Sequence, residues 1–174
     1  VPEIALTSQL IERMERVFGS CVASYHSRLT PQRRTATYLR LLHSSGGELV
    51  IGARSALFLP LRHLQLVVVD EEHDTSYKQS DTAPRYHGRD VAIVLASLYG
   101  ASVVLGSATP SLESYANARW GKYGYSTLTE RYGGAQPPRI IISDTMRSLK
   151  RGERRTHFNQ VLVNSIAAAL ERGE

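Results

Sequence analysis

The sequence predicts an α/β fold with a mostly parallel sheet flanked by helices, and three observations support this prediction. Short continuous runs of apolar and β-branched residues recur along the chain, as in LVVV at 66–69, a pattern typical of strands covered on both faces. Stretches with helical periodicity separate these runs. The 174 residues are 42% hydrophobic and 21% charged, which is sufficient for a domain-sized core.

Five apolar runs are the expected strands. They lie at 21–23, 49–51, 66–69, 103–105 and 140–142. Each is short and bounded by polar residues or glycine, as strands of a buried sheet are.

Helices are expected from about residue 7 to 18, from 91 to 98 and from 158 to 170, because apolar residues recur there at helical spacing. Gly100 is placed to end the second of these. Two further starts share one signature, Thr30-Pro31 and Thr109-Pro110, in which a hydroxyl cap precedes a proline at the first helical position.

Composition limits the possible functions. Cys21 is the only cysteine, which excludes an internal disulfide framework and a cysteine-based zinc site; its apolar surroundings favour a small buried residue. No apolar run approaches the roughly 20 residues of a membrane helix. The net charge of +5, supplied mostly by arginine, favours polyanionic partners, although arginine usage also follows genome composition.

The run 66–69 is followed directly by three carboxylates and a histidine: Asp70, Glu71, Glu72 and His73. Ligands of open α/β sheets bind beyond the carboxyl ends of strands, which is where this cluster falls. Carboxylates at such a place cost desolvation energy unless a cation compensates, and a hydrated magnesium ion would do so. One acid would orient the ion and its neighbour would polarise an attacking water. A solvated acidic turn is the alternative.

The phosphate-binding motif that usually accompanies such a cluster, G-x-x-x-x-G-K-[ST], is absent from the sequence. The only Gly-Lys pair, Gly121-Lys122, is followed by Tyr123 and has no glycine at the required spacing. We therefore expect no phosphate cradle within these residues.

An ordered set of segments carries a family resemblance: VPEIALTSQL, YHSRLT, IGARSALFLPL, LVVVDEEH, SYKQ, RYHGRDVA and LGSATPSLES. Together they resemble the first motor lobe of the superfamily 2 DNA helicases, and more narrowly the bacterial replication-restart helicases. The resemblance covers nearly the whole chain. It implies a RecA-like P-loop NTPase lobe lacking its P-loop strand, which we expect upstream of Val1.

The resemblance also implies a domain organisation. Residues 1–130 would be a partial first motor lobe without the phosphate loop. Residues 131–157 would be a linker and strand toward the second lobe, and 158–174 would begin that second lobe.

The resemblance assigns roles at the nucleotide site. Asp70 would orient magnesium through water and Glu71 would be the general base, in a catalytic group that includes Glu72 and His73. His73 would connect this group to Ser107, Ala108 and Thr109, which would couple nucleotide state to DNA grip. The alternatives are a satisfied surface histidine at His73, a local turn bond at Ser107 and a simple helix cap at Thr109.

The resemblance further implies a single-strand contact surface on polar turns at strand ends. These turns contain Pro2, Glu3, Thr7, His26, Ser27, Gly52, Arg54 and Ser55. Backbone amides, small hydroxyls and one arginine can hold phosphates without reading bases, although Arg54 could equally form a structural salt bridge.

Residues 74–90 are predicted to be a long loop in which aromatic rings alternate with cations. Its candidate DNA-binding residues are Tyr77, Lys78, Arg85, Tyr86, His87 and Arg89. Such a mixture can stack bases and hold phosphates, and it resembles the aromatic-rich loop with which the family senses DNA. A solvated loop without function is the alternative.

The resemblance implies the activity of an ATP- and Mg²⁺-dependent 3′–5′ DNA helicase that acts on single-stranded and forked DNA at stalled replication forks. It implies a location in the bacterial cytoplasm, away from the membrane. Single-strand binding protein and other primosome proteins would be its partners. The family's zinc site would lie outside this chain. Another superfamily 2 translocase is the closest alternative. Without the phosphate loop and second lobe, the isolated chain is expected to be inactive, as a non-catalytic DNA-binding domain would be.

Overall fold

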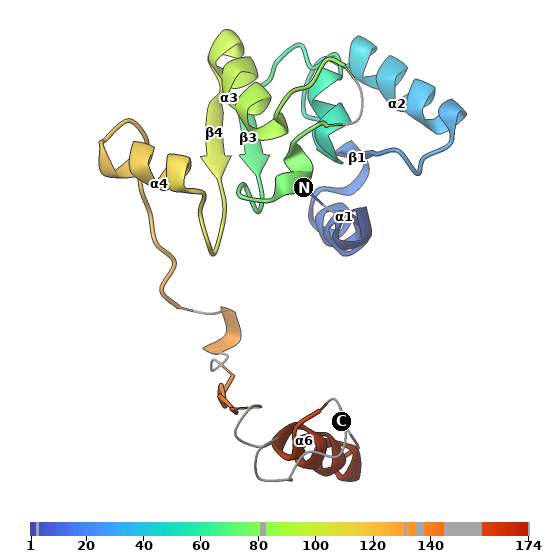
Figure 1. Cartoon of the computed structure of the whole chain (residues 1–174). Helices are drawn as coiled ribbons and strands as arrows, with labels where there is room; N and C mark the ends of the chain where they lie inside the picture. The colour runs from blue at the N-terminus through green and yellow to red at the C-terminus, as the bar shows by residue number, and fades with distance from the viewer. Residues whose placement is uncertain (3, 81–82, 131, 135–137, 145–157, 174) are drawn as a thin grey trace. The chain divides into compact units, whose positions relative to one another are not determined.

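The computed structural model describes residues 1–2, 4–80, 83–130, 132–134, 138–144 and 158–173 (Figure 1). The chain divides into two units, Val1–Tyr125 and Ser126–Glu174. Within the described residues, none of the helices has the length and apolarity that crossing a bilayer demands.

In its described residues, the N-terminal unit alternates helices with four short strands. Its α-helices and strands are α1 (Ile4–Phe18), β1 (Val22–Tyr25), α2 (Pro31–His43), β2 (Leu49–Gly52), β3 (Leu66–Val69), α3 (Gly88–Tyr99), β4 (Ser102–Leu105) and α4 (Leu112–Arg119). Three 3-10 turns join them: η1 (Gly19–Cys21), η2 (Arg54–Phe58) and η3 (Thr75–Tyr77). The order confirms the α/β class predicted from the apolar runs.

All four strands pair in parallel, as two ladders. β1 pairs with β2, and β3 pairs with β4. Tyr25 is opposite Gly52 at the end of the first ladder, and Val69 is opposite Leu105 at the end of the second. The prediction of a parallel arrangement is confirmed, and the carboxyl ends of paired strands lie together.

Two of the expected helix boundaries form as predicted. Thr30 accepts a hydrogen bond from the Arg33 amide at 3.3 Å, and Pro31 is the first residue of α2. Gly100 ends α3 with φ 66°, in the left-handed region that suits glycine.

The start of α4 differs from the expectation. Ser111, not Thr109, caps this helix, and its side chain accepts from the Ser114 amide at 3.3 Å. Thr109, two residues before this cap, has other partners: its amide donates to Ser107 Oγ and its hydroxyl contacts His73 Nε2.

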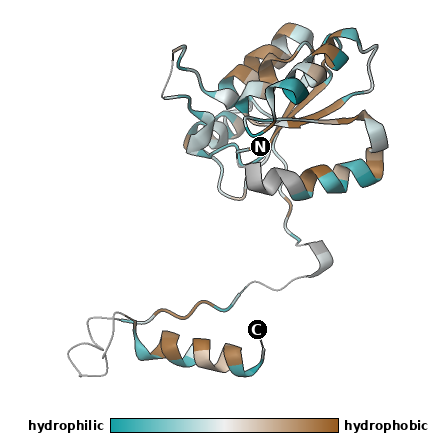
Figure 2. Cartoon of the chain, turned by 90° about the vertical axis from the view of Figure 1, so that its right-hand side faces the viewer, coloured by the Kyte–Doolittle hydropathy of each residue, from teal (hydrophilic) through white to brown (hydrophobic). Residues whose placement is uncertain are grey.

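One hydrophobic core cluster of the N-terminal unit lies between α3 and the β3–β4 ladder (Figure 1). Val69, Tyr77 and Ala92 are its buried members. Figure 2 shows that the strands are largely apolar, as the sequence predicted. However, Leu66 and Val68 remain 53% and 59% exposed, so among the described residues this ladder is covered on one face and not on both.

The C-terminal unit contains η4 (Tyr132–Gly134) and α6 (Gln160–Glu171). Asn159 caps α6 by accepting from the Leu162 amide at 2.8 Å, which confirms the last predicted helix. The expected strand at 140–142 is wrong, because these residues have no regular structure and no described strand pairs with them. Residues 131, 135–137 and 145–157 of the expected linker lie outside the described residues.

Candidate functional site

The acidic cluster and the Ser-Ala-Thr turn lie side by side at the carboxyl ends of β3 and β4. The pairing of these strands continues past their ends: the Gly106 amide donates to the Val69 carbonyl at 2.9 Å, and the Glu72 amide donates to the Gly106 carbonyl at 3.0 Å. The sequence-predicted groups 70–73 and 107–109 are thereby held against each other.

Asp70 and Glu71 present their carboxylates at this edge. Asp70 is exposed, and its Oδ1 accepts from the Glu71 amide at 3.1 Å. Glu71 has φ 48°, a left-handed conformation that is strained for a residue with a side chain, and its side chain is 46% exposed. The turn therefore directs two neighbouring carboxylates out of the strand end.

The surroundings of Asp70 fit a hydrated cation better than a protein cage. Among the described residues, no three His, Cys, Asp or Glu side chains gather to hold a metal ion. Gly106 faces Asp70, and a Cβ at that glycine would lie 3.7 Å from Asp70 Oδ1, so no side chain from this residue crowds the carboxylate. A single accessible carboxylate suits Mg²⁺, which keeps most of its waters when bound to protein.

His73 connects the acidic cluster with the Ser-Ala-Thr turn. Its Nδ1 lies 2.7 Å from Ser107 Oγ and 3.6 Å from Glu71 Oε2, and its Nε2 lies 3.4 Å from Thr109 Oγ1. Ser107 Oγ also accepts from the Thr109 amide at 3.0 Å. Ala108 lies exposed between these two residues. One imidazole thus contacts both hydroxyls of the turn and neighbours Glu71.

Glu72 points into the protein, unlike its neighbours, and is 1% exposed. Its Oε1 accepts from the Ser111 amide at 2.6 Å. Its Oε2 accepts from Arg89 Nη1 at 2.9 Å, from Ser111 Oγ at 3.0 Å and from Ser114 Oγ at 2.9 Å. Burial alone would raise the pKa of Glu72, but these hydrogen bonds together hold it below the ordinary value.

Arg89 belongs to the same network. Its side chain is 13% exposed, and besides Glu72 it contacts Ser111 Oγ at 2.7 Å and Asp90 Oδ1 at 3.0 Å. Burial disfavours the charge, yet the bonds to Glu72 and Asp90 raise the pKa of the guanidinium. Arg89 is therefore committed to protein partners at the start of α3, in contrast to the exposed cations of the preceding loop.

The loop before α3 is anchored at Tyr77. The Tyr77 ring is 4% exposed, and its hydroxyl donates to the Asp70 carbonyl at 2.6 Å. Burial, followed by the carboxylate of Asp70, raises the pKa of this phenol. A residue predicted to face DNA is thus packed beneath the loop and bonded to the backbone of the acidic cluster.

The two ends of the loop also pair with each other. Lys78 forms an antiparallel bridge with His87, and the Gln79 amide donates to the Tyr86 carbonyl at 2.8 Å. The Tyr86 ring meets the Phe58 ring edge-to-face, with centroids 5.3 Å apart. The expected unstructured loop is therefore a short hairpin-like projection; its residues 81–82 lie outside the described part.

Cations and aromatic rings line this projection. Lys78 and Arg85 are exposed, and Tyr86 and His87 are half-buried. His87 Nδ1 is buried without a hydrogen-bond partner among the described residues, and burial lowers the pKa of this imidazole.

The turns after β1 and β2 lie on the edge that carries Asp70. The Val1 amino group donates to the Gly52 carbonyl at 3.1 Å, and the charge of Asp70 partly opposes the lowering of the Val1 pKa by burial. A Cβ at Gly52 would lie 2.3 Å from the Tyr25 carbonyl oxygen, so only glycine fits there. The ends of β1, β2 and β3 therefore form one edge.

The other predicted strand-end residues are distributed along this edge. Pro2, His26 and Arg54 are half-buried, and Ser27 and Ser55 are exposed. The Arg54 stem lies against Gly88, since a Cβ at that glycine would approach Arg54 Cγ to 3.2 Å. Glu3 lies outside the described residues, and Thr7 is in α1 with its side chain outside them.

Sequence reasoning did not identify Ser111 and Ser114, which supply three of the four donors to Glu72. The fourth donor is the Arg89 guanidinium. A signal was available, because Ser111 precedes an apolar residue and an acidic first turn, as helix caps do. The hidden carboxylate that these serines bind had no such signal.

Comparison with known proteins agrees with this geometry. Residues 1–118 match the family model of the DEAD/DEAH box helicases. Over 100% of its length the chain is 42% identical to Replication restart protein PriA of Chlamydia trachomatis and 41% identical to that of Bacillus subtilis, covering 23% and 21% of those proteins. Over 84% of its length it is 50% identical to the Helicobacter pylori protein of the same name, covering 23% of it.

The chain thus spans about a quarter or less of the curated relatives that it matches. The family model covers well over half of the chain and includes the DEEH cluster, the loop and the Ser-Ala-Thr turn. The chain belongs to the DEAD/DEAH box helicase family.

Proposed function

We propose that this chain forms part of an ATP-driven DNA motor that unwinds DNA in the 3′–5′ direction and restarts stalled replication forks. The principal observation is the bond between His73 Nδ1 and Ser107 Oγ at 2.7 Å, which joins the acidic turn to the Ser-Ala-Thr turn. A motor needs such a direct link between the groups that contact nucleotide and an element able to move.

Asp70 would hold a hydrated Mg²⁺ ion, and Glu71 would position and deprotonate the attacking water. The ion would neutralise charge on the triphosphate when bound. The exposed position of Asp70 and the left-handed turn at Glu71 support these roles, since both carboxylates leave the strand end together. The phosphate-binding loop would come from other parts of the full-length protein.

His73, Ser107, Ala108 and Thr109 would couple nucleotide state to movement. The imidazole contacts both hydroxyls of the turn and lies 3.6 Å from Glu71 Oε2, so a change at the general base reaches the turn through one side chain. Glu72 and Arg89 have a positioning role in the proposal, because their charged groups are buried against each other and against the start of α4.

Single-stranded DNA would lie along the strand-end edge and the projection before α3. The residues proposed to contact it are Pro2, Glu3, Thr7, His26, Ser27, Gly52, Arg54, Ser55, Lys78, Arg85, Tyr86 and His87. Exposed cations beside aromatic rings suit phosphates and stacked bases. Tyr77 would not contact DNA; its hydroxyl, which donates to the Asp70 carbonyl, would hold the projection in place.

The wider assignments rest on the same proposal. Forked DNA, single-strand binding protein and other primosome proteins would be the partners, and the bacterial cytoplasm the location. Zinc binding would belong to other parts of the full-length protein, because Cys21 is the only cysteine here. Residues 1–130 would belong to the first motor lobe, 131–157 to the linker and 158–174 to the second lobe.

A second candidate follows from the missing G-x-x-x-x-G-K-[ST] motif. By itself the 174-residue chain would act as a non-catalytic DNA-binding domain, with no ATP turnover. Another superfamily 2 translocase is the alternative for the full-length protein, and a failure to unwind forked DNA despite DNA-dependent ATP hydrolysis would favour it.

Glu71→Gln in the full-length protein tests the proposal. We expect DNA-stimulated ATP hydrolysis to fall by about 10²- to 10⁴-fold, the range for loss of a general base, while nucleotide binding persists. Glu12→Gln, at an exposed position of α1, is the matched control and should leave hydrolysis unchanged. Wild-type hydrolysis rates in Glu71→Gln would refute the assigned role.

A further inference from the structure

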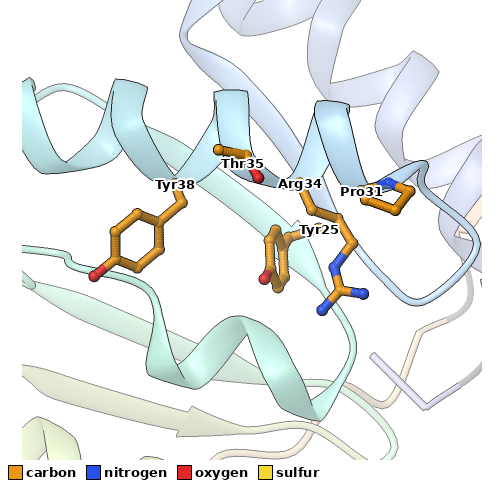
Figure 3. Close-up of a pocket in the computed structure, with 5 residues that line it drawn as sticks. All are labelled: Tyr25, Pro31, Arg34, Thr35 and Tyr38. Carbon is orange, nitrogen blue, oxygen red and sulfur yellow. The ribbon is translucent and has the colours of Figure 1, made fainter.

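A hollow of about 400 Å³ lies between the end of β1 and the first turns of α2 (Figure 3). Its lining residues are Tyr25, Pro31, Arg34, Thr35 and Tyr38. The volume falls in the range of small-ligand sites, and none of the roles proposed above uses it.

Two tyrosines and an arginine form the walls of this Tyr25 hollow. Tyr25 ends β1, and its carbonyl accepts from the Ala53 amide at 3.3 Å, which fixes the backbone below the ring. Arg34 lies with Cζ 5.7 Å from the centre of the Tyr25 ring. Tyr38, one helical turn after Arg34, is 42% exposed, and Figure 3 shows its ring and that of Tyr25 along the same side of α2.

The charge around the hollow favours an anionic ligand. Residues 22–43 contain four arginines and no acidic residue. Arg40 is paired with Glu48, whereas none of Arg28, Arg33 and Arg34 has a carboxylate partner among the described residues. A planar guanidinium next to an aromatic ring can hold a phosphate while the ring offers its face to a base.

The hollow is continuous with the proposed DNA-contacting edge. Tyr25 is opposite Gly52 in the β1–β2 ladder, and Arg54 follows two residues after Gly52. The Arg54 stem in turn lies against Gly88, which also neighbours the Tyr77 ring. A strand lying along this edge from the projection toward α2 would reach the hollow.

We propose that the Tyr25 hollow binds one nucleotide of a single-stranded nucleic acid, with the base stacked on Tyr25 and Tyr38 and the phosphodiester on Arg34. This inference rests on the proposed function and adds a stacking site to it. The lining residues include no carboxylate that could hold a hydrated magnesium ion, so a phosphodiester strand fits better than a magnesium nucleotide.

Photocrosslinking in the full-length protein tests this site. An oligonucleotide carrying 5-iodouracil should crosslink to Tyr25 or Tyr38, located by mass spectrometry. Tyr38→Ala should weaken single-strand binding by about 5- to 150-fold, the range for the loss of one stacked base, and Tyr38→Phe should bind as the wild type does. Tyr99→Ala, an exposed tyrosine at the end of α3, is the matched control.

Two further variants separate stacking from charge. Arg34→Ala should reduce the salt dependence of binding by about one phosphate contact, while Tyr38→Ala should leave it unchanged. Tyr25→Phe should bind as the wild type does, since the phenol hydroxyl has no role in stacking. Tyr38→Ala is the deciding variant, because Tyr38 is 42% exposed and its truncation leaves the fold intact.

The outcomes distinguish this site from the proposed function. If the protein unwinds and binds DNA but crosslinks elsewhere, and Tyr38→Ala binds normally, the hollow is not a nucleotide site while the motor assignment stands. If the protein binds no single-stranded nucleic acid at all, both proposals fail. Protection of the hollow by a protein partner instead of by oligonucleotide would also overturn the inference.

Discussion

Arg89 Nη1 lies 2.9 Å from Glu72 Oε2, and the same nitrogen is 2.7 Å from Ser111 Oγ. These contacts join three segments that are distant in sequence: the acidic turn, the start of α3 and the start of α4. Because the carboxylate is 1% exposed, the ion pair is shielded from solvent and its partners are held in one arrangement.

Glu72→Gln should therefore destabilise the protein although it preserves side-chain size. The amide nitrogen of glutamine would face the donors of Arg89 and the serines, and the arginine would lose its buried counter-charge. We expect the free energy of unfolding to fall by about 3–5 kcal/mol, the range for breaking a buried ion pair, measured by urea denaturation of the chain.

A matched change at the surface isolates the effect of burial. Glu12→Gln removes the same charge from an exposed position of α1 and should alter the free energy of unfolding by no more than about 0.5 kcal/mol. Equal stability of Glu72→Gln and Glu12→Gln would show that the network contributes little.

The lowered pKa of Glu72 predicts how stability depends on pH. The folded pKa lies below the ordinary value of 4.5, so the ionised carboxylate stabilises the protein above pH 4.5. This contribution is lost as pH falls from 4.5 through the folded pKa. Asp74, whose pKa the Ser76 hydrogen bonds also lower, titrates in both wild type and variant and cancels in their difference.

Urea denaturation at several pH values between 3 and 7 tests this prediction. The stability difference between wild type and Glu72→Gln should be constant above about pH 5 and should shrink below pH 4.5. A difference that grows as pH falls would mean that Glu72 binds its proton more readily when folded, contrary to the observed donors.

The sequence predicted where the strands end better than it predicted which way the side chains at those ends point. A continuous apolar run followed by carboxylates placed Asp70 at a strand end, because local pattern determines where a strand stops. The partnership of His73 with Ser107 was expected from resemblance and is found at 2.7 Å. The first feature follows from the local sequence pattern, whereas the second was expected from the family resemblance alone, and the pairing of β3 with β4 brings its two residues together.

Side-chain direction depends on tertiary packing that one sequence does not contain. In the acidic run 70–72, only the left-handed turn at Glu71 separates two outward carboxylates from the inward Glu72, and no local signal marks that turn. Tyr77 and Tyr86 look alike in an aromatic-rich loop, yet one is buried against α3 and the other meets Phe58 nearer the surface. The difference in burial between the two tyrosines comes from α3, which follows both in sequence and packs against Tyr77 through Ala92.

Two glycines should differ in their tolerance of alanine. A Cβ at Gly52 would lie 2.3 Å from the Tyr25 carbonyl oxygen, a backbone atom that cannot move without disturbing the β1–β2 ladder. At Gly88 the nearest atoms are the Tyr77 ring at 3.1 Å and the flexible Arg54 stem at 3.2 Å. Gly52→Ala should therefore cost more stability than Gly88→Ala.

Thermal unfolding of both variants by circular dichroism provides the measurement. We expect a loss of about 2–3 kcal/mol or more for Gly52→Ala, comparable with overpacking of a core, and about 1 kcal/mol for Gly88→Ala. Gly124→Ala is the control, since a Cβ there would meet no atom within 4 Å. The reverse order of the first two would contradict the assigned contacts.

The projection before α3 should transmit DNA binding to ATP hydrolysis through Tyr86 and Tyr77 in different ways. Tyr86 is half-buried and contacts Phe58, a residue that is 60% exposed, so Tyr86→Ala removes a surface on which a base can stack. In the full-length protein it should lower DNA-stimulated ATP hydrolysis by about tenfold and leave basal hydrolysis within about twofold.

Tyr77→Phe should lower both rates, because the lost hydroxyl donates to the carbonyl of Asp70 at 2.6 Å and so supports the residue that we propose orients magnesium. A loss of about one hydrogen bond predicts a decrease of roughly three- to tenfold in each rate. Steady-state hydrolysis with and without single-stranded DNA separates the two tyrosines. If Tyr86→Ala lowered basal and DNA-stimulated hydrolysis equally, the projection would have no role in sensing DNA. A surface ring that acts only by binding DNA has no contact through which it could change basal hydrolysis.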